Sequence, residues 1–173
     1  MDKTERNVAY IDGANLYKGI EDLGWKMDYK RLRIWLTEKY DVEHAYLFLG
    51  LIPKYKDLYT ELQDAGYKLI FKEVTYDKIS KKVKGNCDAD IVVRVMKDTY
   101  ENTFKKAILV SSDGDYASLI SFLMEKSKLE VILSPSTSEK CSVLLKRTDA
   151  KIAYLDHQKS ILENRYRDKN HSH

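Results

Sequence analysis

The sequence predicts an α/β fold in three layers, with a mostly parallel central sheet between two layers of helices. Short runs rich in β-branched and aromatic residues alternate with segments whose apolar residues recur at helical spacing, which is the pattern of α/β domains. The chain has 173 residues, of which 43% are hydrophobic, so it is long enough to bury such a sheet as one domain. We expect this domain to span residues 1–156, followed by a charged C-terminal helix or tail over residues 157–173.

The predicted strands are short apolar runs bounded by charged or turn-forming residues. They cover residues 7–12, 42–51, 67–74, 106–111, 129–134 and 151–156. The lysine-rich run "YDKISKKVKGNC" (76–87) is predicted as a loop or short hairpin. These strands supply the central sheet of the predicted fold.

The predicted helices carry one apolar face each. In "YKRLRIWLTEKY" the spacing of Leu32 and Leu36 gives such a face, and Gly66 is a stop signal for the next helix. The run "ADIVVRVMKDTY" has a composition typical of strands, but Ile91 and Val95 lie at helical spacing and favour a helix. The predicted helices cover residues 29–40, 54–66, 89–100, 116–127 and 138–148.

Composition and motifs exclude several classes of protein. The net charge of +3 is too small to indicate a polyanionic partner by itself. Cys87 and Cys141 lie far apart without a CxxC spacing, which argues against a disulfide framework and a zinc site. The glycine patterns of dinucleotide-binding and P-loop proteins are absent. No apolar leader or membrane-spanning stretch is present, so we expect a soluble, cytoplasmic protein without a membrane partner.

Acidic residues stand at three places where the chain turns into a helix. They are Asp12 in "YIDGAN", Asp88 and Asp90 in "KGNCDAD", and Asp113 and Asp115 in "SSDGDY". Sites in open α/β sheets form at the carboxyl ends of parallel strands. We therefore expect these carboxylates to converge at one edge of the sheet.

Each acid has an alternative role as a helix cap. Asp and Asn are favoured N-cap residues, so Asp12, Asp88 or Asp115 alone would simply cap a helix, and we expect Asn15 to cap the segment after Asp12. A cluster is different, because like charges raise one another's pKa unless a cation neutralises them. Oxygen ligands with few histidines favour Mg²⁺ or Mn²⁺ over zinc. Convergence of the acids therefore predicts a divalent metal site.

Four segments in the order "YIDGANLY", "KGNCDADIVV", "SSDGDYASLI" and "SVLLKRTDAKIAYL" resemble the NYN domains of the LabA-like group, a branch of the PIN-like nuclease fold. The resemblance extends from Val8 to Leu155. It implies a nuclease with a Mg²⁺- or Mn²⁺-dependent acidic pocket that cuts phosphodiester bonds, usually of RNA, with DNA as an open alternative. By this resemblance the catalytic residues, of which the acids bind the metal, are Asp12, Asn15, Asp88, Asp113 and Asp115.

Two features depart from the family pattern. "KGNCD" has one more residue between the glycine and the acid than the commoner "KGVD", so either Asp88 or Asp90 is expected to face the pocket. Relatives often carry a further aspartate where this chain has Arg94. Arg94 would either weaken metal binding or contact a substrate phosphate.

Other residues are predicted to contact the substrate. Ser112 is placed to hydrogen-bond a phosphate, unless it only serves the turn. Tyr17 and Tyr116 lie within the two best motifs, where either ring is placed to stack on an unpaired base, with core packing as the alternative. A basic loop would guide a nucleic-acid backbone or form solvated surface; its residues are Lys78, Lys81, Lys82 and Lys84.

The main alternative to an enzyme is a catalytically silent NYN-like module that binds RNA or a protein, with Arg94 marking a degraded site. The presence of four motif acids favours the enzyme. The sequence also leaves open a homodimer through an apolar helix face.

Overall fold

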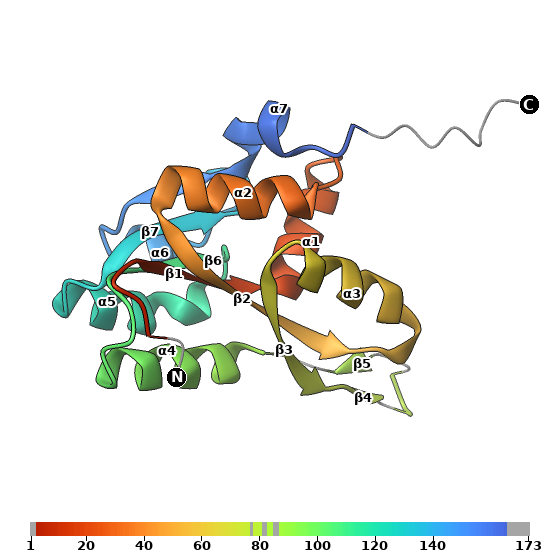
Figure 1. Cartoon of the computed structure of the whole chain (residues 1–173), viewed down its shortest axis with the longest axis horizontal. Coiled ribbons are helices and arrows are strands. Elements are labelled where there is room, and N and C mark those ends of the chain that lie inside the picture. Colours follow the sequence, from red (N-terminus) through yellow and green to blue (C-terminus); the bar gives the residue numbers. More distant parts are fainter. Residues whose placement is uncertain (1–2, 77, 81–82, 85–86, 166–173) are drawn as a thin grey trace, which may run out of the picture.

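The computed structural model describes residues 3–76, 78–80, 83–84 and 87–165 (Figure 1). Its centre is a six-stranded sheet in the order β3-β2-β1-β6-β7-β8, and every neighbouring pair of strands is parallel. The strands are β1 (Asn7–Asp12), β2 (Val42–Leu51), β3 (Tyr67–Glu73), β6 (Ala107–Val110), β7 (Leu129–Ser134) and β8 (Ile152–Tyr154). The predicted parallel sheet is confirmed.

Helices cover both faces of the sheet, and α2 and α4 lie on opposite sides of it (Figure 1). The first face packs against α1 (Gly13–Asp22), α2 (Tyr29–Tyr40), α3 (Lys56–Asp64) and α7 (Lys159–Leu162). The second face packs against α4 (Asp88–Tyr100), α5 (Ala117–Glu125) and α6 (Val143–Lys146). This arrangement confirms the predicted three layers.

The side chains of β1 show why the sheet needs a layer of helices on each face. Ala9 and Ile11 belong to the core cluster on the α1–α3 face, whereas Val8 and Tyr10 belong to the cluster on the α4–α5 face. Successive side chains of a strand point to opposite faces. A central parallel strand is therefore apolar along its buried length, as the run "VAYI" (8–11) is.

Shorter elements connect the layers. They are three 3₁₀ turns, η1 (Pro53–Tyr55), η2 (Gly114–Tyr116) and η3 (Leu155–Gln158), and an antiparallel hairpin of β4 (Thr75–Tyr76) and β5 (Val83–Lys84). The hairpin lies within the segment predicted as a loop or short hairpin. Gly66 has a φ of 104° directly after α3, a left-handed conformation that favours glycine at a helix end, so the predicted stop signal is confirmed.

The helix predicted over residues 138–148 is much shorter in the structure. The backbone N–H groups of Lys140 and Cys141 both donate to the carbonyl of Thr137, which forms a turn. The Ser142 hydroxyl then accepts a hydrogen bond from the N–H of Leu144 and caps α6. The capping serine therefore delays the start of the helix to Val143, and α6 has only four residues.

The C-terminal segment begins by packing on the domain. Leu162 of α7 is fully buried in the same core cluster as α2. The N–H of Asp28 donates to the Leu162 carbonyl at 2.8 Å, and the N–H of Asn164 donates to the Lys26 carbonyl at 2.8 Å. Residues 157–165 are thus held by both apolar and backbone contacts.

None of the helices in the described part of the chain is both long and apolar enough to span a membrane.

The strand order places a topological switch point next to β1. From β1 the chain builds outward to β2 and β3 on one side, and then crosses back to add β6, β7 and β8 on the other. At such a point the two connections leaving neighbouring strands diverge, which opens a crevice at the carboxyl ends of those strands. The switch point here lies at the carboxyl ends of β1 and β6.

Candidate active site

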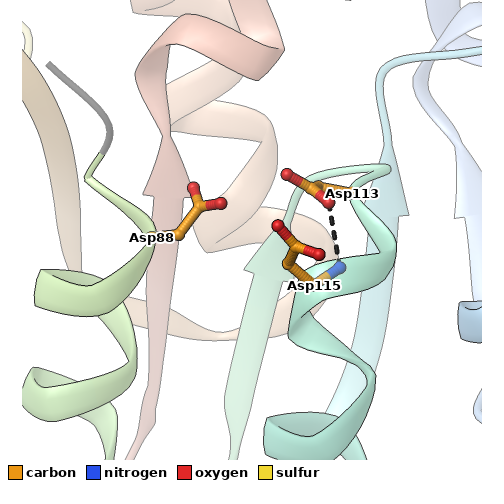
Figure 2. A group of neighbouring side chains, drawn as sticks. All are labelled: Asp88, Asp113 and Asp115. Atoms are coloured by element: carbon orange, nitrogen blue, oxygen red, sulfur yellow. Dashed lines mark hydrogen bonds between the residues drawn. The ribbon is translucent and has the colours of Figure 1, made fainter. Parts of the chain in front are cut away.

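Three carboxylates meet at this switch point. Asp88 lies at the start of α4, and Asp113 and Asp115 lie in the turn between β6 and α5 (Figure 2). Each offers a carboxylate oxygen, and these oxygens lie within 4.8 Å of one another. Asp88 and Asp113 are half-buried and Asp115 is exposed. The site is open to solvent on one side and backed by the sheet.

The turn after β6 is built by its own polar groups. The N–H of Asp113 donates to the buried Ser111 hydroxyl at 3.1 Å, and Asp113 Oδ1 accepts from the N–H of Asp115 at 2.9 Å, which caps η2. A Cβ on Gly114 would lie 2.3 Å from Ser142 Oγ, so a larger residue there would displace the hydroxyl that caps α6. Asp113, and not Asp115, is therefore the cap, and the Asp115 carboxylate points toward Asp88.

Asp12 forms the buried back of the site. Its Oδ1 accepts from the N–H of Asn15 at 3.2 Å and caps α1. Its Oδ2 accepts from the Tyr116 hydroxyl at 3.0 Å, and the same hydroxyl lies 2.9 Å from Asp88 Oδ1. A tyrosine hydroxyl has one proton, so Asp12 and Asp88 share a single donor. Tyr116 thereby links the end of β1 to the start of α4.

Burial and charge both act on the Asp12 carboxyl. Its exposed fraction is 6%, and burial raises its pKa above the ordinary value. The hydrogen bonds from Asn15 and Tyr116 oppose this rise, while the charges of Asp88 and Asp113 add to it. Burial and the two neighbouring carboxylates likewise raise the pKa of Tyr116, so its hydroxyl keeps its proton. The pocket therefore contains a permanent donor between two acids.

Asn15 does not cap a helix, which corrects the sequence prediction. It lies inside the first turn of α1, and its side-chain oxygen accepts from both the N–H (3.0 Å) and the hydroxyl (3.2 Å) of Ser112. These bonds connect the turn after β1 to the turn after β6. Among the described residues the Asn15 amide NH₂ donates no hydrogen bond, so it is available to an oxygen in the pocket.

Comparison with protein families agrees with this geometry. A model of the NYN domain matches residues 7–156. The chain belongs to the NYN domain family. NYN domains are part of a nuclease superfamily, and the three-layer fold is that of PIN-like sandwiches. The match is to the family as a whole, and membership of the LabA-like group stays a prediction.

The fold of this NYN domain is shared by a solved structure. A crystal structure of a protein of unknown function from Vibrio parahaemolyticus is similar with a TM-score of 0.74 and 19% sequence identity, over 94% of this chain and 98% of that one. At this identity the likeness concerns the fold alone. Comparison with curated proteins gives no significant match.

Of the two acids that open α4, the structure brings Asp88 into the carboxylate group. Asp90 lies two residues further along α4 and pairs with Lys72 of β3, with 3.5 Å between Asp90 Oδ2 and Lys72 Nζ. Residues two apart on a helix face different directions. The extra residue in "KGNCD" therefore leaves the pocket acid at Asp88.

Arg94 contacts Asp98 and Tyr46, and it is not part of the acidic group of the site. Its Nε donates to both oxygens of Asp98, at 3.1 and 3.0 Å, and its guanidinium lies 4.5 Å from the centre of the Tyr46 ring. An arginine held in this way does not neutralise the acidic group.

The structure places the tyrosines and lysines that were predicted to contact the substrate in different surroundings. Tyr116 is fully buried, so the prediction that its ring stacks on a base is wrong. Tyr17 is 64% exposed and lines a separate cavity of about 930 Å³ beside α1 and α3, which none of the site's acids lines. Lys78 is exposed. The side chains of Lys81, Lys82 and Lys84 lie outside the described residues.

The role of Tyr116 is what sequence reasoning missed. A signal was present, because Tyr116 directly follows the "DGD" acids and opens the apolar face of α5, and a buried tyrosine hydroxyl needs a hydrogen-bond partner. Only the packing of α4 against β1 brings Asp12 and Asp88 to the two sides of that hydroxyl.

Proposed function

We propose that this NYN domain is a divalent-metal-dependent ribonuclease, which hydrolyses phosphodiester bonds at the acidic pocket on the carboxyl edge of the sheet. The observation that supports it is the group of Asp88, Asp113 and Asp115, whose oxygens approach within 4.8 Å at the switch point. The family match adds that such domains belong to a nuclease superfamily.

The donor set fits Mg²⁺ or Mn²⁺. All the converging ligands are carboxylate oxygens, which are the ligands that these hard cations prefer. Among the described residues no lysine or arginine forms an ion pair with Asp12, Asp113 or Asp115. Clustered carboxylates repel one another, so a cation held by Asp88, Asp113 and Asp115 would relieve this repulsion.

The residues around the acidic group have distinct parts in the proposed reaction. When bound, a divalent cation polarises the scissile phosphate and increases the acidity of water. Tyr116 holds Asp88 in place through the shared proton, and Asp12 supports Tyr116 from the buried side. The free amide NH₂ of Asn15 would donate to a phosphate oxygen, and Ser112 fixes that amide by occupying its oxygen.

Attack by water fits the pocket better than attack by a side chain. Cys87 directly precedes Asp88, but burial and the charges of Asp12 and Asp90 raise the pKa of its thiol to about 11. The thiolate is the reactive form, so this thiol is inert at neutral pH. We therefore propose direct hydrolysis without a covalent intermediate.

Cleavage of end-labelled single-stranded RNA and DNA tests the proposal, in Mg²⁺, in Mn²⁺ and in EDTA. We expect metal-dependent cutting of RNA that Asp113→Asn reduces by at least about 100-fold, since even outer-shell residues of metal sites contribute 10–100-fold. Asp22→Asn, at the exposed end of α1, is the matched control and should cut like the wild type. Asp88→Asn should lose far more activity than Asp90→Asn.

Two results would contradict the proposal. One is the absence of cutting in every metal, and if RNA binding persisted it would point to the catalytically silent module. The other is cutting that persists in EDTA or in Asp113→Asn. Titration of Mn²⁺ by calorimetry separates a lost metal site from a lost catalytic step, because Asp113→Asn should weaken the binding of Mn²⁺ itself.

A further inference from the structure

A groove runs along α4 on the side that faces β3. It has a volume of about 480 Å³, and its floor includes Phe48 of β2 and Ile70 of β3, which are partners across the two strands. Its walls carry Lys72 from β3, and Arg94 and Lys97 from α4. The groove exists because α4 packs over β1 and the inner strands and leaves the edge of the sheet beside it uncovered.

Arg94 is fixed in this groove by a closed set of contacts. Its Nε donates to Asp98, and Asp98, which is only 6% exposed, also accepts from the Tyr10 hydroxyl at 2.7 Å. The Tyr10 ring stacks on the Tyr46 ring with 5.7 Å between centres, and the Arg94 guanidinium lies over that same Tyr46 ring. The plane of the guanidinium is therefore set before any ligand arrives.

The terminal nitrogens of Arg94 remain available. Among the described residues only its Nε donates hydrogen bonds to a carboxylate, while both Nη groups donate none. An arginine whose planar fork is already oriented loses little entropy when it binds a phosphate. If Arg94 had a purely structural role, we would expect its Nη groups to donate hydrogen bonds to the protein as well.

Further cations accompany Arg94. Lys97 lies one turn further along α4, is exposed, and has no ion pair with any described residue. Lys68 lies over the Tyr46 ring at 5.8 Å, and Lys72 stands nearer to the acidic site. Glu73 and Asp90 are the opposing carboxylates on the groove. Lys72, Arg94 and Lys97 are thus the cations that line the groove.

The groove leads directly to the proposed cleavage site. Cys87 lines its end, and Asp88 is the next residue in the chain. Arg94 and Lys97 follow Asp88 by six and nine residues, which is about 9 and 14 Å along a helix that rises 1.5 Å per residue. At about 3.4 Å per nucleotide in a stacked strand, these cations stand about three and four nucleotides from the cleaved bond.

We propose that the groove binds the phosphate backbone of a single-stranded nucleic acid on its way to the acidic site, with Arg94 and Lys97 as phosphate-binding residues. This inference rests on the proposed nuclease function. A groove lined by cations is the arrangement by which proteins follow the backbone of single strands, and Arg94, Lys97 and Lys72 supply these charges here. Arg94 thus serves the substrate and not the metal.

Binding measured without metal tests the groove independently of catalysis. The affinity of the full chain for fluorescein-labelled single-stranded RNA and for DNA of the same sequence is measured in EDTA across a salt series. For Arg94→Ala/Lys97→Ala we expect weaker binding and a salt slope reduced by about 1.4, since each lost phosphate contact on a single strand contributes about 0.7. The control Lys39→Ala/Lys151→Ala removes two exposed charges outside the groove and should keep the wild-type slope.

The outcomes separate the two proposals. A reduced slope in a chain that cuts neither RNA nor DNA would retain the groove and overturn the nuclease. Metal-dependent cutting with an unchanged slope and KM in the double variant would overturn the groove alone. A loss with both nucleic acids identifies the shared phosphodiester backbone as the ligand, and a loss with RNA alone restricts the groove to RNA. Lys97→Ala by itself, at an exposed position without a partner, should lower the slope by about 0.7 if Arg94→Ala disturbs folding.

Discussion

Replacing Tyr116 by phenylalanine tests the buried centre of the acidic site. The ring is fully buried and stays in place, so the change removes only a hydroxyl that donates to Asp12 at 3.0 Å and to Asp88 at 2.9 Å. Hydrogen bonds to charged groups contribute about 1.5–3 kcal/mol. For a chain of this length, 1 kcal/mol corresponds to about 2–4 °C in Tm, so we expect a loss of about 3–12 °C in EDTA.

A matched control is available on the other face of the sheet. Tyr67 is also buried, and its hydroxyl donates to the neutral backbone carbonyl of Tyr29 at 2.6 Å. A neutral hydrogen bond contributes about 0.5–1.5 kcal/mol. Tyr67→Phe should therefore cost less than Tyr116→Phe when both are measured by thermal melting in EDTA.

Metal adds a second arm to this experiment. In EDTA the Tyr116 proton is what eases the repulsion between Asp12 and Asp88, whereas a bound cation would take over that role. Saturating Mg²⁺ should therefore narrow the gap in Tm between Tyr116→Phe and the wild type, and leave the Tyr67→Phe gap unchanged. If Tyr116→Phe lost no more stability in EDTA than Tyr67→Phe, the shared-proton description of the site would be refuted.

Two further predictions concern the turn between β1 and α1. Burial raises the pKa of Asp12 above its ordinary value of 3.8. Between pH 3.8 and this raised pKa, the folded chain binds more protons than the unfolded chain, so the stability falls as the pH rises. Asp12→Asn, which keeps a capping oxygen, should thus raise the Tm in EDTA at neutral pH, with the gain vanishing below pH 3.8, while RNA cleavage is lost; a lower Tm at neutral pH would contradict this. Gly13→Ala should destabilise the chain by about 1–3 kcal/mol in urea despite the better helix propensity of alanine, because its Cβ would lie 2.5 Å from Leu49 Cδ2 and 2.6 Å from the Phe48 carbonyl oxygen. Unchanged stability would show that β2 shifts to accommodate the added methyl group of α1.

Much of the fold could be predicted because its signals are local. Strands β1, β2 and β7 and helix α2 have the bounds that their sequence patterns indicate. A strand buried on both faces must be largely apolar, and a helix on a sheet must carry one apolar face. The residues of each element therefore indicate its type. Two helices are exceptions. Helix α1 lies outside the predicted helices, and a turn hydrogen-bonded to Thr137 replaces the expected beginning of α6.

The candidate site could be predicted only in part. Acids at strand ends indicated a cluster, and parallel strands place such ends at one edge. The choice between Asp88 and Asp90 depends on how α4 is rotated about its axis, which is set by the burial of Ile91 and Val95 against the sheet. A sequence with one extra residue before the helix does not reveal that rotation.

The sequence by itself determined the order and type of most elements, the acidic segments that meet at the switch point and the family to which the chain belongs. Only the tertiary structure decided that Tyr116 is a buried donor shared by Asp12 and Asp88, and that Arg94 is fixed on Tyr46 and Asp98 in a groove beside the site. The partners in these contacts lie 28, 48, 4 and 104 positions apart along the chain. Apart from the neighbouring turn of α4, such contacts arise from packing between distant elements, and hydrophobic periodicity carries no information about which polar groups that packing brings together.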